Sequence, residues 1–283
     1  DPIDLTVDTV APSAPMITGP ADGAAVTDAT PTFTGTGDDG DTITVTDGDG
    51  TVLCTTTVVD GEWSCTPTDP LPEGTNTITP TATDPAGNTT QGDPIDLTVD
   101  TVAPSAPVIT GPADGAVVTD ATPTFTGTGD DGDTITLTDD DGTVLCTATV
   151  VDGVWSCTPT DPLPEGANTI TPTATDLAGN STAGDPIDLT VDTEAPSAPV
   201  ITGPADGAVV TDATPTFTGT GDDGDTITVT DGDGTVLCTT TVVDGAWSCT
   251  PTDPLPEGAS TVTPTATDPA GNSTAGDPID LTV

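Results

Sequence analysis

Residues 42–66 read TITVTDGDGTVLCTTTVVDGEWSCT, and this stretch decides the fold class. Apolar and polar residues alternate across 42–46, which is the period-two pattern of a half-buried β-strand. Asp-Gly pairs, which favour tight turns, then separate 42–46 from 52–58 and 52–58 from 62–66. The stretch therefore predicts three consecutive short strands joined by two turns.

The same pattern continues on both sides of this stretch. Seven strand signals, separated by turns rich in Asp, Gly and Pro, fall near residues 16–18, 32–36, 42–46, 52–58, 62–66, 76–83 and 94–99. Seven short alternating strands in about 90 residues predict an immunoglobulin-like β-sandwich, and no segment shows a helical pattern. The inward-facing residues are predicted to be Ile17, Phe33, Ile43, Val45, Val52, Trp63, Ile78, Ala82, Ile95 and Leu97.

The segment Asp-Pro-Ile-Asp-Leu-Thr-Val begins at Asp1, Asp93, Asp185 and Asp277, so the chain repeats every 92 residues. A period of this length fits a whole small domain, whereas the repeats of solenoid proteins are shorter. We therefore expect an all-β chain of tandem seven-stranded immunoglobulin-like β-sandwiches, arranged as beads on a string. The expected boundaries are residues 1–8 for the last strand of a preceding repeat with its linker, and residues 9–100, 101–192 and 193–283 for three repeats.

The charge composition excludes several classes of function. The 283 residues include no Lys, Arg or His and 47 acidic residues, which gives a formal net charge of -47. Nucleic acids and anionic membrane surfaces are bound through basic groups, so neither nucleic acid nor direct membrane contact is expected. General acid–base catalysis near neutral pH relies mainly on His. The sequence therefore predicts a protein that is not an enzyme and has no catalytic residues.

Each repeat contains two cysteines eleven positions apart, with an Asp-Gly turn between them. The turn predicts a hairpin that brings the two thiols together, so a disulfide is expected within each hairpin, which indicates an oxidising compartment. Free thiols or bonds between chains are the alternatives, whereas zinc is disfavoured because two Cys without His leave its site incomplete. The expected pairs are Cys54 with Cys65, Cys146 with Cys157, and Cys238 with Cys249.

The run TVLCTTTVVDGEWSCTP at residues 51–67 is followed by the segments PLPEG, TATDPAGN and VDTVAP, and these segments recur along the chain with few changes. Together they resemble the bacterial Ig-like repeats of large secreted adhesins and biofilm-associated surface proteins. The resemblance implies a structural spacer or stalk in an extracellular fibre or adhesin at the bacterial cell surface, often with Ca²⁺ at domain junctions. The expected partners are neighbouring repeats of the same protein and other copies in a fibre.

Two other functions remain open. In the first, the repeats assemble into a filament by strand exchange, because the strand at residues 1–7 has no partner in its own chain. In the second, the repeats themselves bind a carbohydrate or protein ligand. Three nearly identical copies favour the spacer, since a specific binding site is rarely needed on every link.

Aspartates cluster in loops that an immunoglobulin topology brings to one end of each domain. Because strands alternate in direction, the second–third, fourth–fifth and sixth–seventh loops meet the incoming linker there. Hard cations such as Ca²⁺ bind clustered carboxylate oxygens, so calcium is the expected cofactor. The predicted ligands are Asp8, Asp39, Asp41 and Asp84 in the first domain, Asp100, Asp131, Asp133 and Asp176 in the second, and Asp192, Asp223, Asp225 and Asp268 in the third. The alternative is that these residues supply turn chemistry or adapt the protein to salt.

Four further residues belong to the same loops. Asp130 precedes Asp131 and is expected at the same end of the second domain. Asn88, Asn180 and Asn272 match the acceptor sequence for N-glycosylation. Each of these asparagines is equally compatible with a role as a loop ligand or a turn residue.

Overall fold

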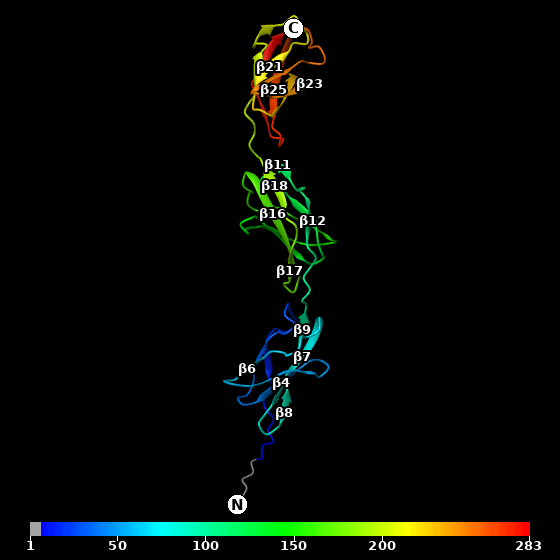
Figure 1. Ribbon diagram of the computed structural model, residues 1–283, viewed down its shortest axis with the longest axis vertical. Helices are drawn as coiled ribbons and strands as arrows, with labels where there is room; N and C mark the ends of the chain where they lie inside the picture. Colours follow the sequence, from blue (N-terminus) through cyan, green and yellow to red (C-terminus); the bar gives the residue numbers. More distant parts are fainter. Residues whose placement is uncertain (1–6) are drawn as a thin grey trace, which may run out of the picture.

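The structure, a computed structural model, describes residues 7–283 and consists of three β-sandwiches that follow one another along the longest axis (Figure 1). None of these residues is helical, and they include no helix that could cross a membrane. The predicted all-β class and tandem arrangement are confirmed. Residues 1–6 lie outside the described part, and the strand of a preceding repeat that was predicted at residues 1–7 falls on them except for Val7, which is not in a strand.

Each domain contains nine strands rather than the predicted seven. The first domain has β1 Met16–Gly19, β2 Ala24–Val26, β3 Phe33–Thr36, β4 Thr42–Thr46, β5 Val52–Thr57, β6 Glu62–Cys65, β7 Gly74–Thr83, β8 Thr89–Gln91 and β9 Ile95–Val99. The second has β10 Val108–Gly111, β11 Ala116–Val118, β12 Phe125–Thr128, β13 Thr134–Thr138, β14 Val144–Thr149, β15 Val154–Cys157, β16 Gly166–Thr175, β17 Ser181–Ala183 and β18 Ile187–Val191. The third has β19 Val200–Gly203, β20 Ala208–Val209, β21 Phe217–Thr220, β22 Thr226–Asp231, β23 Val236–Thr241, β24 Ala246–Cys249, β25 Ala259–Thr267, β26 Ser273–Ala275 and β27 Ile279–Thr282.

Two sheets form each sandwich. In the first domain β1, β3 and β6 form a three-stranded sheet, while the order β2-β9-β7-β4-β5, with β8 beside β7, forms a six-stranded sheet. The strands pair antiparallel except β2 and β9, which run parallel with Ala24 opposite Leu97. The second and third domains repeat this order of strands.

The two strands that the alternation pattern missed are β2 and β8. Each has three residues, which are too few to show a period. Each forms by pairing with a strand that is longer than itself. The ten-residue strand β7 pairs with β9 along Gly74–Ile78 and with β8 along Thr81–Thr83. The strand β8 thus pairs with the part of β7 that β9 does not reach.

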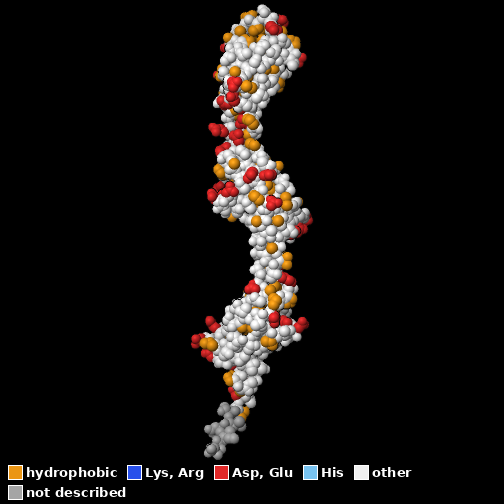
Figure 2. All heavy atoms as spheres, viewed as in Figure 1, with side chains coloured by type: hydrophobic (Ala, Val, Ile, Leu, Met, Phe, Trp, Pro, Cys, Tyr) orange, Lys and Arg blue, Asp and Glu red, His pale blue; other side chains and the backbone are white. Residues whose placement is uncertain are grey.

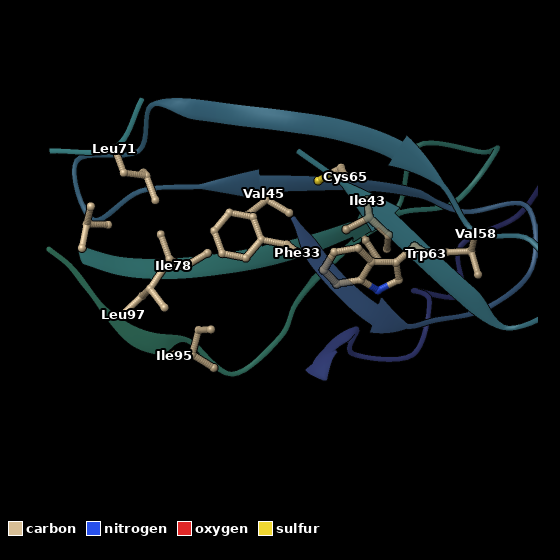
Figure 3. Close-up of a cluster of buried hydrophobic side chains, with 12 residues drawn as sticks. Phe33, Ile43, Val45, Val58, Trp63, Cys65, Leu71, Ile78, Ile95 and Leu97 are labelled. Carbon is tan, nitrogen blue, oxygen red and sulfur yellow. The ribbon is translucent and has the colours of Figure 1, made fainter. Parts of the chain in front are cut away.

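The core of the first domain lies between the two sheets and includes Phe33 and Trp63 (Figure 3). Of the predicted inward residues, all are buried or partly buried except Val52, which is 57% exposed. A β-bulge between Val45 and Thr46 shifts the register, so that Val52 lies opposite Thr46 rather than in line with the inward positions. The prediction for Val52 was wrong because strict alternation fails at a bulge.

Trp63 packs against a position that only glycine can occupy. Gly35 on β3 lies opposite Trp63 on β6, and a Cβ at residue 35 would lie 2.2 Å from the indole Cζ2. The indole Nε1 donates a hydrogen bond of 3.1 Å to the carbonyl oxygen of Thr36, so the buried polar atom has a partner. Trp63 thereby holds β6 beside the loop that begins at Gly37. The same arrangement recurs with Gly127 and Trp155 and with Gly219 and Trp247.

Candidate functional site

The predicted disulfides are present in all three domains and use all six cysteines. They join Cys54 to Cys65, Cys146 to Cys157 and Cys238 to Cys249, with the Cα atoms of each pair 5.9 Å apart. Cys54 lies on β5 and Cys65 on β6, which belong to different sheets. Each disulfide therefore ties the two sheets together at one side of the sandwich.

The hairpin that was predicted between the cysteines is incomplete. Val59 and Glu62 pair across the Asp-Gly turn, but this is an isolated bridge, after which β5 and β6 separate into their own sheets. Asp60 in this turn has a positive φ of 55°, a conformation that Asp tolerates better than most residues. The segment is a tight corner between two sheets. A sequence pattern of two strands around Asp-Gly does not distinguish such a corner from a hairpin within one sheet.

One end of each domain gathers the loops that were predicted to meet there. In the first domain, the backbone N–H of Ser13 in the linker donates to Asp38 Oδ2 (2.8 Å), and Asn88 Nδ2 donates to the carbonyl oxygen of Asp8 (3.3 Å). The backbone N–H of Gly61 in the β5–β6 corner donates to Asp39 Oδ1. Four segments distant in sequence thus converge, and we call this region the acidic end of the domain.

Most of the predicted calcium ligands at the acidic end make turn and loop hydrogen bonds. Asp8 Oδ1 accepts from the N–H of Val10, and Asp39 Oδ1 accepts from Gly61. Asp84 Oδ1 accepts from the backbone of the loop that it begins, and its Oδ2 accepts from Asn88 Nδ2, which lowers the pKa of the Asp84 carboxyl. The corresponding aspartates of the other two domains also accept hydrogen bonds through their carboxylate oxygens. They are Asp100, Asp131, Asp176, Asp192, Asp223 and Asp268.

Asp41 differs from these residues because it is buried. Its side chain is 4% exposed, and its Oδ2 atom has no hydrogen-bond partner. Burial raises the pKa of the Asp41 carboxyl, and the charges of Asp38 and Asp84 raise it further. Asp133 and Asp225 hold the same position in the other domains, with the same unpartnered oxygen and the same direction of pKa shift.

The carboxylates that act on Asp41 are Asp38 and Asp84, so Asp38 is a residue that the predicted ligand set omitted in favour of its neighbour Asp39. Sequence could not choose between them, because both occupy the same Gly-Asp-Asp-Gly turn. Within residues 7–283, no three carboxylates or thiols are grouped closely enough to form a ready metal site. Calcium at the acidic end stays a prediction.

The amide nitrogens of the three glycosylation motifs are already engaged. Asn88 Nδ2 donates to Asp84 Oδ2, and Asn180 Nδ2 and Asn272 Nδ2 make the corresponding bonds to Asp176 and Asp268. Each also donates to a linker carbonyl, and each asparagine is half-buried. The asparagines therefore hold the acidic end together, which accounts for their presence in the loop.

Hollows that could receive a ligand are found on the domain surfaces. One of them, of 530 Å³, lies beside β3 and β6 in the first domain, and its lining includes threonine and serine side chains, Glu62 and the buried Trp63. Smaller hollows of 130–140 Å³ lie beside the Pro-Leu-Pro segment of every domain. Acidic side chains are spread over all three domains on the face drawn in Figure 2, including next to the junction of the second and third.

Three successive parts of the chain, residues 4–101, 106–193 and 198–283, match the model of one family, the bacterial Ig-like domain. The chain belongs to this family. Its bacterial Ig-like domains follow one another in tandem, as the repeat of 92 residues indicated. No curated protein matches the chain.

Several solved structures are similar to these bacterial Ig-like domains. A tetra-tandem repeat in the extending region of a large adhesion protein is 29% identical, over 90% of this chain and 70% of that chain, with a TM-score of 0.28. The fibronectin(III)-like modules of Clostridium thermocellum CbhA are 16% identical over 62% of this chain and 93% of that chain, with a TM-score of 0.45. The BSP domain of a biofilm associated protein is 16% identical over 96% of this chain and 66% of that chain, with a TM-score of 0.26.

Proposed function

We propose that this chain is a spacer in a bacterial extracellular adhesin or surface fibre, stiffened by Ca²⁺ at the domain junctions and by the disulfides within the domains. The observation that carries the proposal is the buried, unpartnered carboxylate oxygen of Asp41, Asp133 and Asp225 at the acidic end, where the linker arrives. An unpaired buried carboxylate is costly unless a proton or a cation compensates its charge. The same unfavourable burial of a carboxylate recurs in three successive domains, so a cation that binds at the same position in each domain is the simplest explanation.

Calcium suits this position chemically. Ca²⁺ takes six to eight oxygen ligands from carboxylates, carbonyls and water, and the acidic end offers both carboxylates and carbonyl oxygens. These carboxylates are not grouped closely enough to hold an ion as they stand, so binding would have to draw them together. The set is Asp38, Asp41 and Asp84 in the first domain, Asp130, Asp133 and Asp176 in the second, and Asp222, Asp225 and Asp268 in the third. The ion would offset repulsion between like charges beside the linker.

The disulfides support an extracellular location, because they persist in oxidising compartments. The absence of His, Lys and Arg from the sequence supports a role without catalysis. Ligand binding is a weaker candidate. The hollow beside Trp63 offers little aromatic surface, since the ring is buried, and its carboxylate Glu62 is replaced by Val154 and Ala246 in the other domains.

The test is a calcium titration of the three-domain chain at constant ionic strength, followed by small-angle scattering, with EDTA as the reference. We expect Ca²⁺ at roughly 0.1–1 mM to lengthen the particle and narrow its distribution of distances. Asp133→Asn and Asp225→Asn together should abolish this response, because Asn keeps the side-chain volume and loses the charge.

Asp140→Asn is the matched control, since this exposed residue belongs to the β13–β14 turn of the second domain and not to the acidic end. It should leave the calcium response unchanged. A particle whose dimensions are the same with calcium and with EDTA would show that the aspartates serve as turn and solubility residues.

A further inference from the structure

A single residue at each junction is hydrogen-bonded to both of its neighbouring domains. The backbone N–H of Asp100 donates to the carbonyl oxygen of Val26 in the first domain (3.0 Å), at the end of β2. Its own carbonyl oxygen accepts from Asn180 Nδ2 in the second domain (2.8 Å). At the next junction, Asp192 donates to Val118 (2.9 Å) and accepts from Asn272 Nδ2 (2.9 Å).

The following residue is held by a glutamate of the preceding domain. The backbone N–H of Thr101 donates to both carboxylate oxygens of Glu73 (3.3 and 3.2 Å), and its hydroxyl group donates to Glu73 Oε1. Thr193 makes the corresponding bonds to Glu165 through its N–H (3.2 Å) and its hydroxyl group. Hydrogen bonds to a carboxylate are about twice as strong as bonds between neutral groups.

The linker then packs on the following domain. The backbone N–H of Ser105 donates to Asp130 Oδ2 (3.0 Å), and the corresponding bond joins Ser197 to Asp222 (3.0 Å). A Cβ at Gly184 would lie 2.0 Å from the carbonyl oxygen of Pro107, so the linker backbone lies directly on the second domain. The loop that ends at Asn180 also reaches the first domain, where a Cβ at Gly179 would lie 4.0 Å from the methyl group of Thr27.

We propose that Glu73 and Glu165 are positioning residues that set the relative orientation of neighbouring domains without a metal ion, together with Asn180 and Asn272. The glutamate accepts hydrogen bonds from the linker in one domain, and the asparagine of the next domain donates one to it. The two linker residues that they bind are adjacent in the chain. The inference rests on the proposed spacer function and adds to it a source of stiffness that chelation does not remove.

The choice of residue supports this role. The sequence has five glutamates among its 47 acidic residues, and three of them, at positions 73, 165 and 257, occupy the same Pro-Glu-Gly turn. Where short loops need a carboxylate, this chain uses Asp. The longer side chain occurs at the position from which it reaches out of the domain to the linker.

The test compares Glu73→Ala and Glu165→Ala with Glu257→Ala in the three-domain chain, in calcium-free buffer with EDTA. Glu257 holds the same turn in the third domain and bonds no linker residue in the described chain, so it controls for any effect on the turn itself. Residual dipolar couplings, measured for each domain separately, report whether neighbouring domains align as one body. We expect the alignment magnitudes of domains on either side of a mutated junction to diverge, and Glu257→Ala to leave them equal.

A second variant keeps the result interpretable if the turn is disturbed. Thr101→Val replaces the hydroxyl group with a methyl group and should loosen the first junction partly, whereas Thr101→Ser keeps the hydroxyl group and should leave the junction unchanged. The amide of Thr101 should exchange with solvent roughly fivefold to tenfold faster in Glu73→Ala, as the loss of one such hydrogen bond implies. Alignment and exchange that stay at the levels of the unmodified chain in Glu73→Ala would overturn the proposal.

The calcium titration and the glutamate variants test different proposals, so their results can differ. If Ca²⁺ fails to change the particle while Glu73→Ala loosens it, the glutamate inference stands and the calcium proposal falls. If Ca²⁺ stiffens the chain and Glu73→Ala has no effect in EDTA, the reverse holds.

Discussion

The first and third domains hold the Pro-Glu-Gly turn in different ways. In the first, Asn76 is buried and its Nδ2 donates to the carbonyl oxygens of Pro72 and Gly74, both at 2.9 Å, and Asn168 does the same in the second domain. In the third domain the position is Ser260, whose Oγ is buried without a hydrogen-bond partner. A hollow of 320 Å³ lies beside it, lined in part by Pro256 and Thr261.

The difference shows how one side chain can order a turn and the strand that follows it. The two carbonyls that Asn76 holds lie on either side of Glu73, so the asparagine also orders the residue that bonds the linker. The strand begins at Gly74 in the first domain and at Gly166 in the second, but at Ala259 in the third, one residue later in the repeat. We expect the third domain to be the least stable of the three.

The largest expected effect comes from removing a disulfide from each of the two domains. Replacing both cysteines of one disulfide with Ala should lower the unfolding free energy of that domain by about 2–3 kcal/mol, the value expected for so short a closed loop. The two pairs to replace are Cys54 with Cys65 and Cys238 with Cys249. The third domain should then unfold at the lower urea concentration. The indole N–H resonances of Trp63 and Trp247 follow each domain separately. Equal midpoints for the two domains would contradict the assigned role of the asparagine.

A smaller effect is expected from Asn76→Ala, which leaves two carbonyl groups without their donor. We expect a loss of about 1–3 kcal/mol in the stability of the first domain, measured by urea unfolding. Thr75→Ala is the control, because Ala already stands at this position in the second and third domains. It should change the stability by less than about 0.5 kcal/mol, as most surface substitutions do.

The reverse change sharpens the comparison. Ser260→Asn should raise the stability of the third domain by about 1 kcal/mol, since the amide group can donate to the turn carbonyls where the hydroxyl group finds no partner. Protection of the amide of Gly258 from hydrogen exchange should rise with it. Ala259→Thr, which introduces the residue of the first domain at the preceding position, should leave both values unchanged.

The buried aspartate should contribute a pH dependence of the same sign in the two domains, because its pKa is raised in both. The folded state raises the pKa of Asp41 and of Asp225 above the usual 3.8, so it holds the proton more tightly than the unfolded chain does. This stabilisation is fully present below 3.8 and is lost as the pH rises through the raised value. In metal-free buffer, the unfolding midpoint should therefore increase as the pH is lowered toward 3.8. Asp41→Asn should flatten the profile of the first domain and leave that of the third intact.

Most of the fold could be predicted from the alternation of apolar and polar residues and from the repetition of the sequence. The pattern at Thr42–Thr46 and the recurrence of one segment every 92 residues were enough to predict a tandem β-sandwich. What they could not show depends on contacts between distant residues. The strands β2 and β8 form on longer neighbours, and the bulge beside Thr46 turns Val52 outward, which strict alternation places inward.

The candidate site divides in the same way. The cysteine spacing was sufficient to pair Cys54 with Cys65, but not to show that the bond joins two sheets. The topology argument placed the aspartate loops at one end of the domain. Which carboxylate lies buried, and that Asp38 rather than Asp39 raises its pKa, depends on side-chain direction within one turn. Glu73 escaped notice because its partner belongs to the linker beyond the end of the domain.

The disulfide between sheets has a consequence for a chain that is pulled from its ends. Eleven residue steps separate Cys54 from Cys65, and this loop cannot extend while the bond is intact. Each step would otherwise add about 3.3–3.6 Å, so an unfolding domain should lengthen by roughly 30–35 Å less than its residue count allows. Stretching single molecules with optical tweezers, before and after a reducing agent, would measure this difference as a longer step. The oxidation state of the surroundings would then set the contour length that each domain can release under force.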